Sequence, residues 1–389
     1  MPKKVRMGMV GGGQGAFIGA IHRLAAGITG EIDLVAGAFS RDGDASRAFG
    51  AELGLSPERS YASYTEMFGA ELALPEDIRM QCVSIVTPND SHADIACSAM
   101  KAGFDVICDK PLAGVLEDAL RIEEAVNETG RLFALTQTYT GYPMAIEARE
   151  RIAAGELGEI RRVAVSYLQD WLSREDDTKG SKQASWRSDP ARSGESGAFA
   201  DIGTHAYNMV EFMTGERVTD VAAELRAVLP GRAIDDDGMA MFRLDGGAAG
   251  LISASQVCSG AINALRIEIY GSKASLHWFQ EEPNSLSLKR RGEPEMVLRS
   301  GAGTPYLSDA ALAVCRTPGG HPEGYIEAFA NLYAAFAADV RDGGKRPGTP
   351  PGYATIEDGM SAMRFIRAAN ISSKNNSAWT PLAGIENQS

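Results

Sequence analysis

The sequence predicts a two-domain α/β chain: a doubly wound parallel sheet, followed by an α+β domain on a large, mainly antiparallel sheet with one open face. In the first 140 residues, short apolar runs alternate with helical segments, as in parallel sheets covered by helices on both faces. Later strands alternate apolar and polar positions, which is typical of antiparallel sheets with one solvated face. A chain of 389 residues is also too long for one typical core. We therefore expect domains at 1–140 and 141–389, with the C-terminal helix packing back on the first domain.

The first domain is expected to alternate strands and helices from its start. Its strands are predicted at residues 5–10, 31–38, 82–87, 105–108 and 132–137. Its helices are predicted at residues 17–27, 45–53, 92–103 and 115–129. The helix over 92–103 ends at a glycine, which is a usual stop signal.

The second domain is expected to mix helices with half-buried strands. Helices are predicted at 143–154, 322–340 and 354–369. Strands are predicted at 160–167, 219–229, 238–244, 249–258, 264–270 and 274–278. The polar, glycine-rich stretch 173–197 is expected to be a long loop, which in compact domains is usually functional or disordered.

Composition excludes several classes of partner. The net charge of −13 argues against nucleic acid, which needs clustered Lys and Arg. No apolar run approaches the ~20 residues that span a bilayer, so we expect no membrane partner. The five cysteines are odd in number and form no C-x-x-C pair, so neither a disulfide framework nor a metal site is expected. The cysteine usage and the lack of a secretory leader favour a cytoplasmic protein.

A glycine loop opens the chain. Gly11-x-Gly13-x-x-Ala16 lies between the first strand and the first helix. Glycine permits a tight turn and close approach of a pyrophosphate, and a helix N-terminus offers free amides to phosphates. The pattern predicts a Rossmann-type dinucleotide site; the alternative is a glycine-rich turn without a ligand.

The residues leave the choice between NAD and NADP open. The second strand is followed by Ser40, Arg41 and Asp42, with no carboxylate at the strand end itself. Asp42 would serve the ribose hydroxyls of NAD, whereas Arg41 would meet the 2′-phosphate of NADP.

Asp109-Lys110-Pro111 follows the strand over 105–108. The carboxyl ends of parallel strands face the ligand crevice, so Lys110 would point toward the reactive end of the cofactor. An ammonium there would hold a substrate hydroxyl and stabilise the alkoxide as its proton leaves. The alternative is a solvated surface lysine.

Asp201 and His205 are spaced i, i+4 and share one face if the segment is helical. Imidazole titrates near neutrality and takes a hydroxyl proton as hydride departs, while a carboxylate orients it. The alternative is a capping Asp beside a buried structural His. A metal fits less well, because no second His or Cys lies at ligand spacing.

These segments together resemble the Gfo/Idh/MocA oxidoreductase family over nearly the whole chain. Thr87-Pro88-Asn89 with His92 resembles its T-P-N-x-x-H turn, and Asp109-Lys110-Pro111 resembles its E-K-P motif. Gly155-Glu156-Leu157-Gly158 resembles the turn that opens its second domain. Trp186-Arg187 and the stretch from Gly197 through Asp201 to His205 resemble its catalytic helix.

The resemblance implies a catalytic trio of Lys110, Asp201 and His205, with His205 as base. It implies an NAD- or NADP-dependent dehydrogenase that oxidises a secondary hydroxyl of a cyclic polyol or sugar, an inositol or aldose, to a ketone or lactone. NAD is the expected cofactor, with NADP as the alternative. Members often form homodimers or homotetramers through the open sheet face. A looser likeness is to the inositol and unusual-sugar subgroup, including scyllo-inositol and L-glucose dehydrogenases.

Two departures stand out: Asp109 replaces the usual Glu, and the glycine loop is longer, reaching Gly19. Residues expected to bind the cofactor are Gly11, Gly13, Gln14, Gly15, Ala16, Phe17, Ser40, Arg41, Asp42, Thr87, Pro88, Asn89, His92, Asp109, Lys110, Gln137, Trp186 and Arg187. Residues expected to bind the substrate are Lys110, Tyr139, Lys182, Arg187, Asp201, His205 and His321.

Three other functions stay open at this stage. One is an NAD-recycling glycosidase of the same fold. Another is a non-catalytic dinucleotide sensor. The third is an NADPH-dependent reductase, which Arg41 favours.

Overall fold

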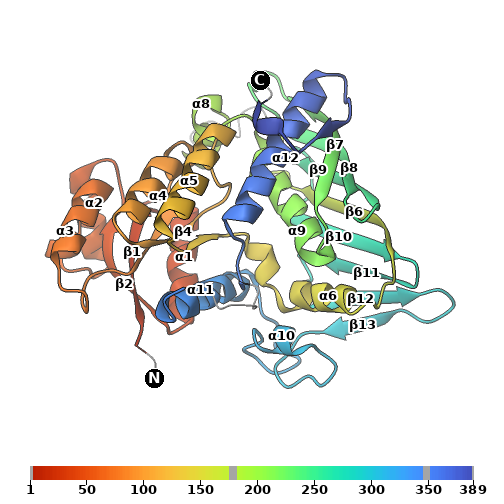
Figure 1. The fold of residues 1–389 in the computed structure, drawn as a ribbon, viewed down its shortest axis with the longest axis horizontal. Helices are drawn as coiled ribbons and strands as arrows, with labels where there is room; N and C mark the ends of the chain where they lie inside the picture. The colour runs from red at the N-terminus through yellow and green to blue at the C-terminus, as the bar shows by residue number, and fades with distance from the viewer. Residues whose placement is uncertain (1–2, 175–181, 345–350, 388–389) are drawn as a thin grey trace. The chain divides into compact units, whose positions relative to one another are not determined.

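The computed structural model describes residues 3–174, 182–344 and 351–387. The chain forms two compact units, each with its own sheet (Figure 1). The first unit combines Met1–Gln137 with Phe329–Met360, and the second combines Thr138–Ala328 with Ser361–Ser389. The first unit therefore takes in a segment that is distant in sequence.

The sheet of the first unit is parallel, with strand order β2-β1-β3-β4-β5. Its strands are β1 (Val5–Gly11), β2 (Ile32–Ala38), β3 (Cys82–Val86), β4 (Asp105–Cys108) and β5 (Phe133–Leu135). A parallel bridge between Gly37 and Ser60 continues the sheet beyond β2. If the segment at Ser60 is counted as the third strand along the chain, the strands lie in the order 3-2-1-4-5-6. This is the order of dinucleotide-binding sheets. The predicted doubly wound sheet is confirmed.

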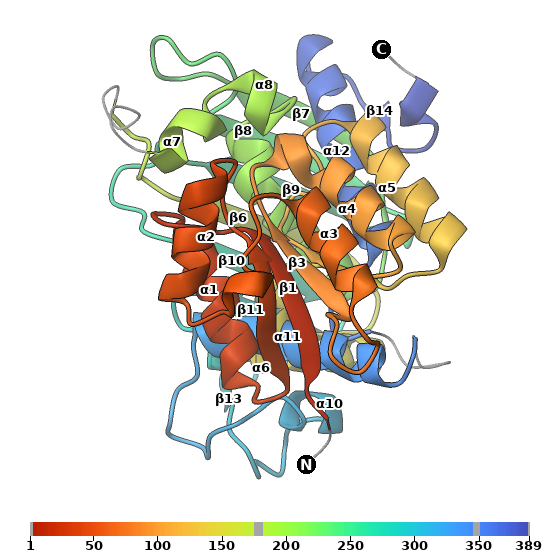
Figure 2. The same cartoon turned by 90° about the vertical axis from the view of Figure 1, so that its left-hand side faces the viewer.

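Helices cover both faces of this sheet (Figure 2). On one face, α1 (Phe17–Ile28) and the α11 residues from Phe329 onward share a core with Val5, Met7 and Met9 of β1. On the other face, α4 (His92–Lys101) packs on β3 and β4 and against α5 (Leu116–Thr129). The remaining helices of this unit are α2 (Gly43–Glu52) and α3 (Tyr64–Ala73).

The second unit holds a nine-stranded sheet with order β13-β12-β11-β10-β6-β9-β8-β7-β14. Its neighbours pair antiparallel except β6 and β9, which are parallel. The strands are β6 (Ile160–Leu168), β7 (Val218–Arg226), β8 (Asp237–Leu244), β9 (Ala249–Ser255), β10 (Ala264–Gly271), β11 (Ala274–Phe279), β12 (Ser285–Arg290), β13 (Met296–Arg299) and β14 (Thr380–Pro381).

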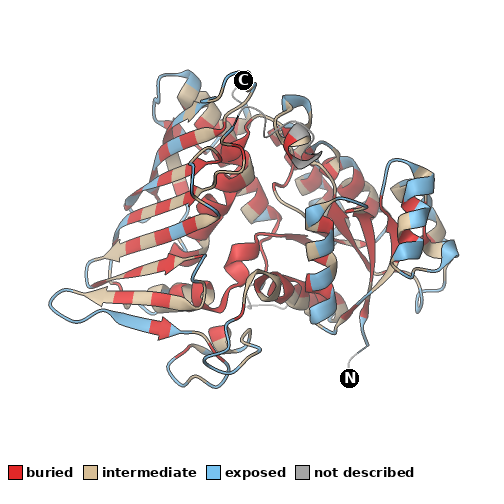
Figure 3. Cartoon of the chain, turned by 180° about the vertical axis from the view of Figure 1, so that it is seen from behind, coloured by how far each residue is buried: buried red, intermediate tan, exposed pale blue. Residues whose placement is uncertain are grey.

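One face of the large sheet is covered and the other is open. The helices α6 (Pro143–Ala153) and α9 (Thr204–Thr214) pack on the covered face. Buried and exposed residues alternate along the strands (Figure 3). On β8, for example, Ala240 and Phe242 are buried, whereas Met239 and Met241 are exposed. The predicted open-faced, mainly antiparallel sheet is confirmed.

Several elements differ from the sequence prediction. The stretch 173–197 contains two short helices, α7 (Lys182–Arg187) and α8 (Pro190–Ser193), where only a loop was expected. Strands β12 and β13 and helices α3 and α10 (Asp309–Leu312) were not predicted. The last long helices are α11 (Tyr325–Arg341) and α12 (Ile356–Lys374), close to the predicted ranges.

Candidate active site

The carboxyl ends of the parallel strands bring most of the predicted cofactor residues to one edge of the first unit. Val10 pairs with Ala38 and Ile85, Ile85 with Cys108, and Cys108 with Leu135. These positions form one row across the sheet. The glycine loop, Ser40, Thr87, Lys110 and Gln137 each follow this row within a few residues, at the edge where α/β sheets bind ligands.

The glycine loop is shaped by positions that only glycine fits. Gly11, Gly12 and Gly15 have φ values of 82°, 67° and 76°, in the left-handed region. A Cβ on Gly13 would lie 2.6 Å from the carbonyl oxygen of Phe39. A Cβ on Gly19 would overlap the backbone of Gly12, so these two glycines make the close contact between loop and helix.

Gly19 was missed as a functional residue by the sequence pattern, which ended at Ala16. The structure starts α1 at Phe17 and seats Gly19 on Gly12. The third glycine of the dinucleotide fingerprint serves close helix packing. Gly19 meets that requirement, and the extended loop is the signal that pointed toward it.

The turn after β2 holds Ser40, Arg41 and Asp42 at the surface. Asp42 is the N-cap of α2, where its Oδ1 accepts the Ala45 amide at 2.9 Å. The Arg41 guanidinium approaches Asp90 at 3.4 Å and its side chain is 78% exposed. The structure thus gives Asp42 a capping role, while Arg41 reaches outward.

His92 links the turn after β3 to the segment that follows Lys110. Its ring is fully buried, with Nδ1 3.0 Å from the Pro111 carbonyl and Nε2 2.9 Å from the Thr87 carbonyl. The ring therefore braces the turn after β3 against the segment after β4. A direct cofactor contact of His92, Pro88 or Asn89 stays a prediction.

Asp109 anchors the segment that carries Lys110. Its Oδ1 accepts the Lys110 amide at 3.0 Å and the Thr136 hydroxyl at 2.9 Å. Burial acts to raise the pKa of Asp109, but the approach of His22 at 3.7 Å and the charges of Lys110 and His92 outweigh it and lower that pKa. The carboxylate is therefore ionised, and it fixes the backbone from which Lys110 projects.

In the second unit, Asp201 lies in a π-helical turn, Phe199–Gly203, that leads into α9. π-Helical turns are rare and often occur at functional sites. The Asp201 Oδ2 accepts hydrogen bonds from Gln256 at 2.8 Å and from Arg187 at 3.2 Å. Gln256 comes from the segment after β9 and was missed, because nothing in the local sequence links it to Asp201.

His205 sits on the first turn of α9 and is 8% exposed. Its ring meets Tyr139 edge-on at 4.8 Å between centroids and lies 6.1 Å from Tyr167. Burial raises the pKa of Tyr139, and the charge of Asp201 adds to this, whereas hydrogen bonds with Tyr167 and Asn263 oppose it. Tyr139 and Tyr167 therefore border the imidazole, which is largely buried in the second unit.

The other predicted substrate residues lie in different surroundings. The Arg187 guanidinium stacks over the Trp186 ring at 4.2 Å. His321 is exposed in the loop before α11, where its amide donates to Pro318 and its carbonyl accepts from Thr317. Lys182 begins α7, and its side chain lies outside the described part of the structure.

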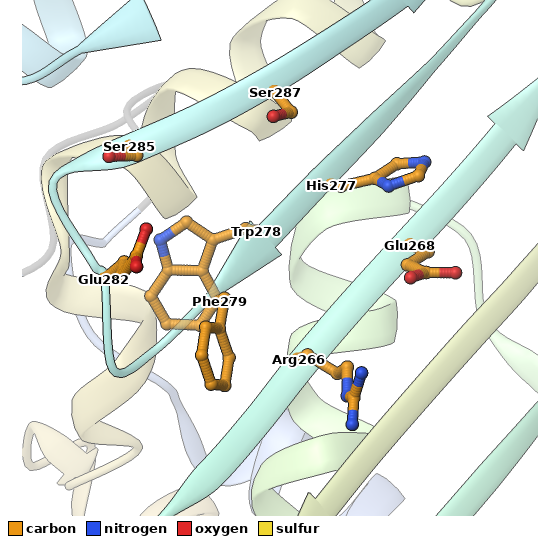
Figure 4. Close-up of a pocket in the computed structure, with 8 residues that line it drawn as sticks. All are labelled: Arg266, Glu268, His277, Trp278, Phe279, Glu282, Ser285 and Ser287. Carbon is orange, nitrogen blue, oxygen red and sulfur yellow. The ribbon is translucent and has the colours of Figure 1, made fainter. Parts of the chain in front are cut away.

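A hollow of about 300 Å³ lies on strands β10 to β12 of the second unit (Figure 4). Arg266, Glu268 and His277 line it on neighbouring strands. Arg266 pairs with Ser166, one position before Tyr167, and side chains alternate along a strand. The hollow therefore lies on the open face, opposite the face that carries Tyr167 and His205.

NAD fits the carboxyl edge of the first unit on two observations. The space beside Gly15 is open, whereas Gly11 lies too close to β3, and Gly13 too close to Phe39 after β2, for any side chain. In addition, the buried Thr87 Oγ1 has no hydrogen-bond partner within the described ranges. The phosphates of a dinucleotide would accept hydrogen bonds from the backbone amides of the glycine loop, and the dinucleotide would give the Thr87 hydroxyl a hydrogen-bond partner.

The comparisons with known proteins agree with this reading. Residues 5–137 match the family described as an oxidoreductase family with an NAD-binding Rossmann fold, and residues 145–277 match the GFO/IDH/MocA C-terminal domain. The uncharacterised oxidoreductase YfiI of Bacillus subtilis is 32% identical over 383 residues, covering 97% of this chain and 96% of YfiI. The chain belongs to the Gfo/Idh/MocA oxidoreductase family.

Solved structures show the same fold for this Gfo/Idh/MocA chain. An inositol dehydrogenase homologue from Azotobacter vinelandii, complexed with NAD+, is similar with a TM-score of 0.93 and 35% identity, over 98% of both chains. The structure of that homologue with NADH and myo-inositol has a TM-score of 0.90 and 34% identity, also over 98% of both chains. Residues 5–137 thus form an NAD-binding Rossmann domain, and the chain is an NAD-dependent oxidoreductase.

Two further features bear on the chemistry of this family member. In the residues that the structure places, no group of three or more His, Cys, Asp and Glu side chains is arranged to hold a metal ion. Among the helices so described, none is both long and apolar enough to cross a membrane.

Proposed function

We propose that the protein is an NAD-dependent dehydrogenase that oxidises a secondary hydroxyl of a cyclic polyol or sugar, an inositol or aldose, to a ketone or lactone. The observation that carries the proposal is that hydrogen bonds from Gln256 and Arg187 hold Asp201 in the turn that leads into α9, where His205 lies on the first turn. The relative that was solved with NADH and myo-inositol supports the substrate class.

The catalytic groups are Lys110, Asp201 and His205. Bound NAD supplies the hydride acceptor at nicotinamide C4. His205 takes the hydroxyl proton as the C–H bond breaks, and Asp201 orients the imidazole and stabilises its charged form. Lys110 stabilises the alkoxide that develops on the substrate oxygen.

The remaining roles follow the same scheme. The residues predicted to bind NAD hold it along the glycine loop and the turns after β2 and β3, with Trp186 and Arg187 added from the second unit. Tyr139, Lys182, Arg187 and His321 are proposed to contact the other substrate hydroxyls.

The direct test is an absorbance screen at the reduced-nicotinamide band. Inositols and aldoses of both hands are supplied, with NAD and NADP in parallel. We expect stoichiometric NADH and an oxidised product from at least one cyclic substrate. Release of a leaving group without net NADH would instead indicate a cofactor-recycling glycosidase. Cofactor binding without turnover on any polyol would indicate a sensor.

The residue roles are tested by His205→Asn and Lys110→Met. Positioned acid–base help is worth about 10²–10⁴-fold, so His205→Asn should lower kcat by that order and leave NAD affinity nearly unchanged. His277→Asn and Lys101→Met are matched controls outside the proposed site, and they should retain activity. Wild-type turnover in His205→Asn would rule out its role as base.

We also propose that the chain forms a homodimer or homotetramer through the open face of the large sheet. Met241 and Leu251 face each other across β8 and β9 and are 47% and 41% exposed, with Met239 exposed beside them. A contiguous apolar patch of this kind marks an interaction surface. Light scattering should give an oligomer for the wild type and a smaller species for Met241→Glu. A wild-type monomer would contradict the proposal.

A further inference from the structure

A chain of buried polar groups runs through the core of the first unit to Asp109. The Tyr333 hydroxyl of α11 lies 2.7 Å from His22 Nδ1 of α1 and 2.9 Å from the Ser84 hydroxyl of β3. On its other side, His22 Nε2 lies 3.7 Å from Asp109 Oδ1. His22, Ser84 and Tyr333 are completely buried.

The apolar surroundings of His22 make the burial of its polar ring atoms unfavourable in free energy. Its ring packs edge-on against Phe329 at 4.7 Å, within an apolar core. Buried polar atoms are normally satisfied, because an unpaired one loses its hydration without compensation. Yet His22 Nε2 has no hydrogen-bond partner within the described residues, and it faces the Asp109 carboxylate beyond hydrogen-bond range. Such an atom calls for a functional explanation.

Asp109 is the link between this buried chain and Lys110. One carboxylate oxygen receives the Lys110 amide, the Thr136 hydroxyl and the approach of His22. A change in the charge or position of this carboxylate would therefore move the backbone that aims Lys110. His22 approaches from the core side, where solvent does not reach it.

We propose that His22 is a positioning residue for hydride transfer, which acts through the Asp109 carboxylate to fix the place and charge of Lys110. This inference rests on the function proposed above for Lys110. His22 would keep Asp109 ionised, while the hydroxyls of Tyr333 and Ser84 orient the imidazole from its Nδ1 side.

The other ionisable groups around Asp109 do not replace His22. Burial raises the pKa of Cys108, next to it on β4, and the charge of Asp109 adds to the rise, so that thiol is neutral. Burial likewise raises the pKa of Tyr333. The titratable groups that face the cluster are His22 from α1, Cys82 from β3, Cys108 and Lys110 from β4 and the turn after it, His92 from α4, and Tyr333 from α11.

Substitutions at His22 separate positioning from packing. His22→Gln keeps an amide donor near the Nε2 position, whereas His22→Asn is too short to approach Asp109. We expect His22→Asn to lower kcat about tenfold, less than the loss of a catalytic group itself, with little change in NAD affinity. His22→Gln should recover much of this loss.

A second readout needs no turnover. The rate at which acetic anhydride modifies Lys110 is measured by mass spectrometry, across pH, on wild type, His22→Asn and Tyr333→Phe. His22→Asn should shift the pH dependence of Lys110 modification, and Tyr333→Phe should shift it less. If the wild type oxidises no polyol, the proposed function fails, but this measurement still decides whether His22 acts on Lys110.

A double-mutant cycle measures whether His22 and Asp109 act on Lys110 together or independently. If His22 acts through Asp109, the double variant His22→Asn/Asp109→Asn should change kcat, or Lys110 modification, no more than Asp109→Asn alone. Fully additive losses, or a His22→Asn protein with wild-type kcat and wild-type Lys110 reactivity, would overturn the proposal. Where His22→Asn does not fold, Tyr333→Phe carries the comparison through the smaller shift that is expected in Lys110 modification.

Discussion

The carboxylates of this site take their partners from distant parts of the chain. Asp109 is held by Thr136 from the turn after β5, and Asp201 is held by Gln256 from the segment after β9. Hydrogen bonds to an ionised acceptor are stronger than neutral ones, and they fix its geometry as well as its charge. Each carboxylate can therefore orient a neighbouring base or cation with little freedom.

Arg41 should decide how well the enzyme accepts NADP. Its exposed ion pair with Asp90 is worth about 0–1 kcal/mol, so a 2′-phosphate can displace that partner easily. We expect Arg41→Ala to weaken NADP binding more than NAD binding, as measured by titration calorimetry with both cofactors. Arg47→Ala, in the neighbouring helix α2, is the control and should affect both cofactors little. Equal losses for the two cofactors in Arg41→Ala would contradict the assignment.

At the scale of elements, the contact between β1 and α1 depends on two glycines. A Cβ on Gly19 would overlap the Gly12 backbone, whereas a Cβ on Gly27 of the same helix meets nothing within 4 Å. Gly19→Ala should therefore push the loop away from the helix and weaken NAD binding. Gly27→Ala should leave binding intact and stabilise the fold by about 0.4–1 kcal/mol, since it removes unfolded-state entropy. Cofactor titration and urea unfolding measure both, and equal behaviour of the two variants would refute this account.

Asp235 secures the turn that carries Asp201. It accepts the amides of Gly197 and Phe199 at 2.8 Å each and the Ser196 hydroxyl at 2.6 Å. Asp235→Ala removes these acceptors and leaves buried donors unsatisfied, at about 1–3 kcal/mol for each group. We expect a lower melting temperature and a lower kcat, read by calorimetry and steady-state assay. A variant with a lower melting temperature but unchanged kcat would show that this turn does not position Asp201.

The alternation of strands and helices could be predicted because the core faces carry period-two and helical patterns. The elements that escaped prediction lack such patterns. Helix α3 buries Glu71, whose carboxylate pairs with Arg59 and accepts the Tyr61 hydroxyl, so its inward face does not look apolar. Helices α7 and α8 lie in a polar stretch with no apolar stripe.

Short sequence motifs led to the proposed site residues Lys110 and His205, whose roles stay predictions. The supports of these residues could not be predicted, because they are set by tertiary contacts. Gln256, Asp235 and Tyr333 lie far along the chain from the groups they hold, and no local spacing connects them. Gly19 is intermediate: the long loop pointed to it, but only its contact with Gly12 shows its role.

At the scale of the whole molecule, buried tyrosines should make the fold sensitive to alkali. Burial raises the pKa of Tyr61 to about 12, and Glu71 adds to the rise. Burial likewise raises the pKa of Tyr139, Tyr142, Tyr167, Tyr207, Tyr333 and Tyr353. An unfolded tyrosine loses its proton near pH 10, whereas these folded ones keep theirs.

The folded state therefore binds more protons than the unfolded state above about pH 10, and stability must fall as pH rises through this range. Urea unfolding at about pH 9 and about pH 11 should show a lower midpoint at the higher pH. Tyr61→Phe should show a smaller fall than the wild type. A midpoint that stays constant between the two pH values would contradict this prediction.

In the proposed reaction, hydride passes directly from a substrate carbon to NAD. Fully deuterated myo-inositol, or whichever substrate the screen identifies, is incubated with the enzyme and NAD, and the reduced cofactor is analysed by mass spectrometry. We predict monodeuterated NADH in equal amount to a keto product, with slower formation in His205→Asn. Unlabelled NADH, or product formed with no reduced cofactor, would contradict it.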